Sequence, residues 1–105
     1  MSVPPRVWKF AVPMPDEDGR SFVDMPLAVE PLSVGLQDDA LFVWALVQPG
    51  EHEPHEEANG PRQFIVANTG MEIPRFPEGA RFLGTVTTSN GIVWHVLDGD
   101  AETTA

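Results

Sequence analysis

Proline interrupts this chain so often that it limits what the backbone can form. All 11 prolines lie within the first 77 residues, and each breaks a helical pattern because it lacks a backbone N–H and clashes with the preceding turn. Between these breaks lie short runs rich in β-branched, aromatic and leucine side chains, a composition typical of strands. The runs cover residues 7–12, 32–36, 41–47, 63–67, 81–87 and 92–97.

These runs predict an all-β fold, a small antiparallel sandwich or barrel of about six strands with at most one helical turn. The 105 residues suffice for one core, so we expect a single domain over 1–105, with an ordered core at about 6–98 and a polar tail at 99–105 that frays. Cysteine is absent, so neither disulfides nor thiolate metal sites stabilise the fold.

The clearest turn lies before the last run, where Asn90 and Gly91 favour the positive φ of a tight hairpin. A three-residue loop at 89–91 puts Val86 opposite Trp94, and we expect Gly84 beside that indole. A two-residue loop would mix polar and apolar side chains on one face, which a buried face does not tolerate. With the three-residue loop, one face is apolar and holds Phe82, Val86, Ile92, Trp94 and Val96.

A second hairpin is predicted at Asp38 and Asp39, because it pairs Val34, Leu36, Leu41 and Val43 across the strands. The run 41–47 is apolar at every position, which predicts a strand covered on both faces, at a sheet centre or between layers. The run 7–12 alternates as a strand with one covered face does, and Lys9 would help to protect a sheet edge.

The net charge of −10, with 16 acidic and 6 basic side chains, disfavours general nucleic-acid binding. The acids cluster at 16–18, 38–39, 51–57 and 98–102, where we expect solvated turns, loops or a tail. No apolar run reaches the length of a signal peptide or a membrane span. These features predict a cytoplasmic protein that does not bind membranes.

Histidine and glutamate gather at 51–57, with His52 and His55 among four carboxylates, and such side chains suit zinc or nickel. The metalloprotease pattern places its two histidines four residues apart on a helix, whereas these lie three apart with Pro54 between them. An acidic solvated loop explains the same residues. We therefore expect no metal and no cofactor.

Catalytic groups are scarce. His95 lies in the last run on the face opposite Trp94, where a strand histidine with a satisfied hydrogen bond is the simpler interpretation. No cysteine nucleophile exists, and none of the four serines stands in a strand-turn-helix context. The sequence therefore indicates a protein that is not an enzyme.

A ligand site is predicted around the turn Asn68-Thr69-Gly70, whose amides and hydroxyl could face an anion, although an ordinary turn has the same sequence. Arginines flank this turn in the sequence, and arginines beside indoles could hold a phosphorylated or planar ligand. In the alternative interpretation these arginines pair with nearby acids, and Arg20 could come near in either case. The candidate ligand-binding residues are Arg62, Asn68, Thr69, Gly70, Arg75, Arg81, Trp94 and His95.

Several motifs, in this order along the chain, resemble a family of small uncharacterised proteins of bacteriophages and bacteria. They are Val7-Trp8-Lys9-Phe10, Asp24-Met25-Pro26, Val34-Gly35-Leu36-Gln37, the run 41–47, Asn68-Thr69-Gly70, Ile73-Pro74, Phe82-Leu83-Gly84-Thr85 and Val93-Trp94-His95-Val96. The resemblance implies a phage or prophage origin and brings no established activity. Family members tend to have glycine where this chain has Asp39, and they lack the histidine-rich loop.

Three functions follow as hypotheses. The first is a non-enzymatic phage accessory protein that counters host defence in the host cytoplasm by sequestering a small nucleotide-like ligand. The second is an acidic inhibitor that binds a basic host protein, and the third, which the sequence favours least, is a metal-dependent enzyme. An exposed strand edge or tryptophan patch would also permit a homodimer.

Overall fold

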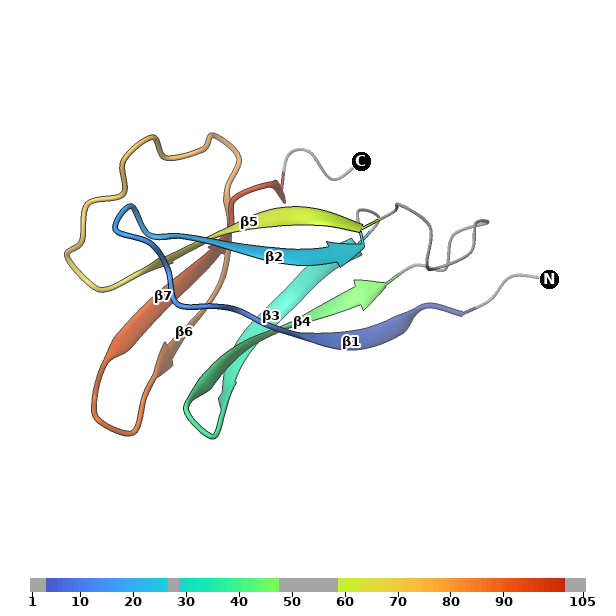
Figure 1. The fold of residues 1–105 in the computed structure, drawn as a ribbon, viewed down its shortest axis with the longest axis horizontal. Helices are drawn as coiled ribbons and strands as arrows, with labels where there is room; N and C mark the ends of the chain where they lie inside the picture. The colour runs from blue at the N-terminus through green and yellow to red at the C-terminus, as the bar shows by residue number, and fades with distance from the viewer. Residues whose placement is uncertain (1–3, 27–28, 48–58, 102–105) are drawn as a thin grey trace.

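The computed structural model describes residues 4–26, 29–47 and 59–101 (Figure 1). None of these residues forms an α-helix, and no helix among them could span a membrane. They form seven strands: β1 (Arg6–Ala11), β2 (Arg20–Pro26), β3 (Val29–Gln37), β4 (Ala40–Val47), β5 (Asn59–Ala67), β6 (Arg81–Thr87) and β7 (Val93–Asp98).

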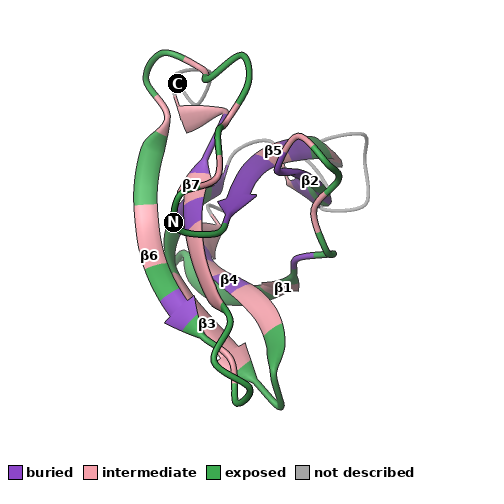
Figure 2. Cartoon of the chain, turned by 90° about the vertical axis from the view of Figure 1, so that its left-hand side faces the viewer, coloured by how far each residue is buried: buried purple, intermediate pink, exposed green. Residues whose placement is uncertain are grey.

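The strands make two antiparallel sheets, one of three strands in the order β1-β4-β3 and one of four in the order β2-β5-β7-β6. The sheets face each other as a sandwich, which confirms the predicted fold class with seven strands in place of about six. On one side β3 and β6 lie next to each other (Figure 2). On the other side of the sandwich, β1 is the edge strand of the three-stranded sheet and β2 is the edge strand of the four-stranded sheet.

The core lies between the two sheets. Its largest members are Phe64 and Met25, at 0% and 1% exposure, and Trp94 packs against it from the side. The buried core cluster consists of Val12, Val23, Met25, Val29, Val43, Ala45, Phe64, Val66 and Val96. Because both sheets supply these residues, burying them stabilises the sandwich as a unit.

Strand β2 was missed by the sequence prediction. Its inner positions Ser21, Val23 and Met25 are buried, whereas Phe22 and Asp24 between them are exposed, the alternation of a half-covered strand. A serine at an inner position, together with the acid and the terminal proline, obscures this pattern in the sequence. An edge strand tolerates that proline because one of its sides makes no ladder hydrogen bonds.

The β6–β7 hairpin has the predicted three-residue loop, with Val86 opposite Trp94. The apolar face was predicted wrongly at its two ends. A register shift between Phe82 and Gly84 turns Phe82 outward, where it is 59% exposed, and Ile92 near the turn is 41% exposed. Such a shift changes which side chains face inward, and Leu83 packs against the core instead.

The neighbour of Gly84 also differs from the prediction. A Cβ added there would lie 3.0 Å from Cγ2 of Val34 on the opposite sheet. The missing side chain therefore lets β6 approach β3, rather than making room for the indole of Trp94.

The β3–β4 hairpin has the predicted register, with Val34 opposite Val43 and Leu36 opposite Leu41. Asp38 and Asp39 take φ angles of 52° and 62° at its turn. Aspartate tolerates this left-handed conformation better than most residues. The turn therefore forms without glycine at either position.

Strand β4 lies at the centre of its sheet, as predicted, and its inner residues Val43 and Ala45 are 0% exposed. The prediction that both faces of β4 are covered is wrong for the outer face, because only residues of the inner face are fully buried. The outer side chains Phe42, Trp44 and Leu46 are half-buried.

Order continues to the end of β7 and beyond. Asp98 is 1% exposed, so the prediction that it belongs to a solvated acidic cluster at 98–102 is wrong. The next residue, Gly99, donates its N–H to the carbonyl of Gln63 at 2.9 Å, and the Asp100 carboxylate accepts from the N–H of Gln63 at 2.7 Å.

Candidate functional site

Arg20 begins β2 and lies on the outer face of the four-stranded sheet, opposite Ile65. It is 7% exposed, yet its guanidinium bonds backbone carbonyls. Nη2 donates to the carbonyl oxygens of Pro74 at 2.5 Å and Arg75 at 3.0 Å, and Nη1 donates to that of Asp18 at 3.2 Å. One side chain thus connects the loop before β2 to the loop before β6.

The loop before β2 is held by a second set of hydrogen bonds. The Asp16 carboxylate accepts from the backbone N–H groups of Asp18 and Arg20, both at 2.9 Å, as aspartate commonly does in turns. Gly19 supplies the positive φ of 76° that closes the turn. The Ser21 hydroxyl donates to the carbonyl of Pro13 at 2.7 Å.

The loop between β5 and β6 spans residues 68–80 and contains no strand or helix. Arg75 takes a φ of 52° and forms an ion pair with Asp18, with Nη2 to Oδ2 at 2.8 Å. Hydrogen bonding and charge attraction from that carboxylate raise the pKa of Arg75. Loops of this length in compact domains are uncommon and are often functional.

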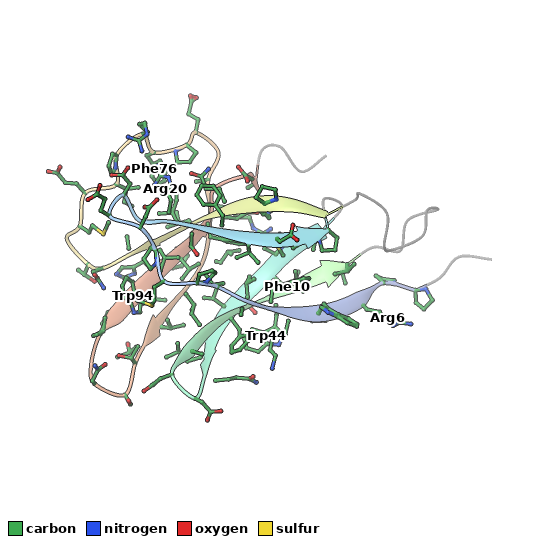
Figure 3. All side chains as sticks on the ribbon, in the orientation of Figure 1. Arg6, Phe10, Arg20, Trp44, Phe76 and Trp94 are labelled. Carbon is green, nitrogen blue, oxygen red and sulfur yellow. The ribbon has the colours of Figure 1, made fainter. Side chains whose placement is uncertain are left out.

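Together these two loops, residues 12–19 and 68–80, form a surface that we call the loop platform. It exposes Met14 and Phe76, at 73% and 52%, and Figure 3 shows Phe76 at the same end of the molecule as Arg20. Five acidic side chains and one arginine belong to its two segments. The platform is therefore acidic and carries exposed apolar side chains on a fixed backbone.

The predicted polar site is only partly brought together. Thr69 Oγ1 lies 2.6 Å from His95 Nε2, and Thr85 Oγ1 lies 2.9 Å from His95 Nδ1. Asn68 Nδ2 donates to the carbonyl of Val93 at 2.9 Å, and Gly70 follows with a φ of 87°. His95 thus has the satisfied hydrogen bonds of the simpler interpretation, and both its ring nitrogens are occupied by hydroxyls.

Trp94 lies on the other face of β7, against the core. It is therefore separated from the imidazole that the sequence prediction grouped with it, because successive side chains of a strand point to opposite faces.

The predicted arginine group does not form. Arg62 is 7% exposed and forms a bidentate pair with Asp98, at 3.0 Å from Nε and 2.7 Å from Nη2. Arg81 lies 3.7 Å from the carboxylate of Glu30 on the other sheet. With Arg75 bound to Asp18, all three arginines pair with acids, as the alternative interpretation predicted.

The histidine-rich segment 51–57 lies outside the described residues. Within the described ranges, no three His, Asp or Glu side chains are grouped so that they could hold a metal ion.

Sequence reasoning missed the central role of Arg20 and the exposed Met14 and Phe76. The available signal was the long stretch between two strand-like runs with Gly and Pro at 70, 74, 77 and 79, which marks a loop. Its fixed conformation depends on backbone carbonyls that sequence patterns do not reveal.

Residues 4–105 match a family described as a domain of unknown function, DUF7352. No curated protein and no solved structure matches the chain.

Proposed function

The chain belongs to the DUF7352 family, a domain of unknown function, and we propose that it is a non-enzymatic protein whose loop platform binds a basic protein partner. One observation carries the proposal: Arg20, although buried, holds two exposed loops by their carbonyl oxygens. Fixing loops before binding lowers the entropy that association costs. The fold thus stabilises a surface whose exposed residues lie outside the core between the sheets, to which the platform contributes Val12.

The exposed apolar side chains of the platform suit a protein partner. Aromatic residues and methionine are enriched at the centres of protein interfaces, and a few such residues usually carry most of the binding free energy. Phe76 and Met14 stand in this position, each more than half exposed. We assign them the role of apolar anchors.

The acids of the platform suit a basic partner. Glu17, Glu72 and Glu78 are exposed. In the sequence, Glu17 follows Met14 in the first loop, and Glu72 and Glu78 lie on either side of Phe76 in the second. Complementary charge speeds encounter and disfavours wrong partners more than it tightens the final complex. The chain's net charge of −10 acts in the same direction.

The finer proposal is that the partner is a host defence protein and that the chain is a phage or prophage accessory protein acting in the host cytoplasm. Its support is the resemblance of the motifs to small phage and bacterial proteins. The alternative, sequestration of a nucleotide-like ligand, loses its main support because Arg62, Arg75 and Arg81 each bind a carboxylate.

The test is affinity capture from host-cell extract with three immobilised proteins: wild type, Phe76→Ala and the matched control Phe82→Ala. Phe82 is similarly exposed, at 59% against 52%, but lies on β6 outside the loop platform. We expect wild type and the control to retain the same basic protein and Phe76→Ala to lose it. Retention should also fall with salt, because the Debye length shrinks from about 10 Å at 0.1 M to about 3 Å at 1 M.

Equal retention by all three proteins, or retention indifferent to salt, would reject the proposal. Isothermal titration with cyclic and ADP-ribose-type nucleotides tests the alternative separately. Heat from such a titration that survives Phe76→Ala would favour ligand sequestration.

A further inference from the structure

A second surface, on the outside of the three-stranded sheet, is unusually apolar. In one row across the strands Val7 lies opposite Leu46, and in the next Lys9 lies opposite Trp44. We call this surface the outer aromatic face. It consists of Val7, Lys9, Phe42, Trp44 and Leu46.

The large side chains of this face lie flat. Lys9 Nζ is 4.7 Å from the centre of the Phe42 ring and donates to Gln37 Oε1 at 2.6 Å. The Trp44 indole extends over Gly35, where an added Cβ would lie 3.1 Å from its ring. The cation–π contact and the missing side chain keep the face level, so a flat surface can rest on it.

The sequence of β4 predicts a cover for this face. Strands that are apolar at every position normally lie in sheets with both faces buried, and β4 is apolar throughout. Among the described residues of β4, those that belong to the core cluster or pack against it all lie on the inner face: Leu41, Val43, Ala45 and Val47. Figure 3 shows Trp44 on the side of the sheet away from Phe10, which packs against the core.

We propose that a second copy of this chain covers the outer aromatic face, forming a dimer by stacking sheet on sheet. The charge distribution favours a second copy. Although the chain carries −10 overall, the charged side chains that the register of the described strands places on this side are Lys9 and Glu30, and Glu30 lies 3.7 Å from Arg81. Two acidic molecules therefore repel each other less when they meet through this face than through the acidic loop platform.

The shape of the face also fits its own copy. Small residues alternate with the large rings: Ala11 lies opposite Phe42, and Ser33 opposite Trp44. Stacked sheets interdigitate the side chains of their facing surfaces, and a two-fold axis would place the rings of each copy over the small residues of the other.

The small area of the face limits how stable the dimer can be. Three strands spaced ~4.8 Å apart and ~20 Å long present roughly 300 Å² per copy. The stacked pair thus falls among the small interfaces, below about 1,200 Å² in total, that weak and reversible complexes use. We expect monomer and dimer to exchange with concentration. This dimer goes beyond the proposed function and leaves the loop platform free.

The chain offers a direct test because Lys9 is its only lysine. A two-fold axis near Trp44 puts the two Lys9 residues roughly 15 Å apart, given ~4.8 Å between strands and ~10 Å between sheets. An amine-reactive cross-linker should join Lys9 to Lys9 of the second copy, identified by mass spectrometry as two identical peptides linked together. Sedimentation velocity over a dilution series should show the dimer fraction falling.

Val7→Glu places a carboxylate on the face at an edge-strand position that is 57% exposed, so the fold should be retained. We expect this variant to stay monomeric and to lose the Lys9 cross-link. The matched control is Phe22→Glu, which introduces the same side chain at 55% exposure on the outside of the other sheet. The control should dimerise as wild type does.

Three results would overturn the dimer: a wild type that is monomeric at all concentrations, a dimer that survives Val7→Glu, or equal loss of the dimer in both variants. None of them bears on capture through Phe76, so the dimer and the proposed function fail independently.

Discussion

Arg20 and Arg62 are buried to the same extent, 7% exposed each, but they hold different parts of the molecule. Arg62 meets a carboxylate, Asp98, and ties two neighbouring strands of one sheet. Arg20 bonds the carbonyl groups of Asp18, Pro74 and Arg75 in two loops. Arg62 thus belongs to a buried ion pair inside the fold, whereas Arg20 fixes an exposed surface.

The difference teaches how burial should be interpreted in a small sandwich. A buried charge must be compensated, and a paired carboxylate achieves this at the lowest risk to stability. Carbonyl dipoles compensate a guanidinium less completely, so Arg20 is the less expected arrangement of the two. Its persistence is understandable if the loops it holds have a function.

The largest expected effect comes from breaking the pair. Asp98→Ala leaves the Arg62 guanidinium buried without its bidentate partner, and removing one member of a buried pair typically costs about 3–5 kcal/mol of the unfolding free energy. Urea denaturation followed by tryptophan fluorescence should show this loss. The double variant Arg62→Leu/Asp98→Leu should recover much of it, because no unpaired charge remains. An unchanged midpoint for Asp98→Ala would mean that the pair does not stabilise the fold.

A smaller and more local effect is expected at the other arginine. Arg20→Ala removes three hydrogen bonds to carbonyls and should lower the unfolding free energy by about 1–3 kcal/mol. Hydrogen exchange should quicken in residues 68–80 and change little in β4. If exchange instead quickened uniformly, Arg20 would be a general stabiliser like Arg62, and the contrast between them would fail.

The smallest effect concerns an exposed connection between the two hairpin tips. Asp39 accepts hydrogen bonds from the side chain and the backbone N–H of Ser89, and these lower the pKa of Asp39 below its ordinary value of 3.8. Because the pKa of Asp39 is lower in the folded state than in the unfolded state, ionised Asp39 stabilises the fold at pH values above its unfolded-state pKa. This stabilisation is lost as the pH falls through the folded-state pKa. Wild type should therefore exceed Ser89→Ala slightly in stability at neutral pH, with the difference shrinking below about pH 4. A stability difference between wild type and Ser89→Ala that grows as the pH falls would contradict this prediction.

The local parts of the fold were predictable from the sequence. Both hairpin registers follow from side-chain alternation and from turn residues that tolerate positive φ, at Asp38 and Asp39 and at Gly91. The register shift near Leu83 was not predictable, because strict alternation in the run 81–87 puts Phe82 and Val86 on one face and Leu83 with the threonines on the other. The close approach of Gly84 to Val34 is a contact between the sheets, which alternation along one strand does not encode.

The candidate site was much less predictable. The sequence grouped Arg62, Arg75 and Arg81 by proximity along the chain, whereas their partners Asp98, Asp18 and Glu30 are all remote in sequence. Pairings of this kind depend on which strands and loops become neighbours in the folded chain, which no local pattern encodes. The contact of Thr69 with His95 did join two residues that the sequence had grouped.

The order of strands within the sheets has a consequence for how the chain folds. Two hairpins, β3–β4 and β6–β7, join strands that are neighbours in sequence. In contrast, β1 pairs with β4 and β2 pairs with β5, so each of these strands pairs with one that is synthesised much later. Local pairings close faster because they sacrifice less chain entropy. The edge strands β1 and β2 should therefore dock last, and during synthesis the chaperones of the cell would meet them while they are still unpaired.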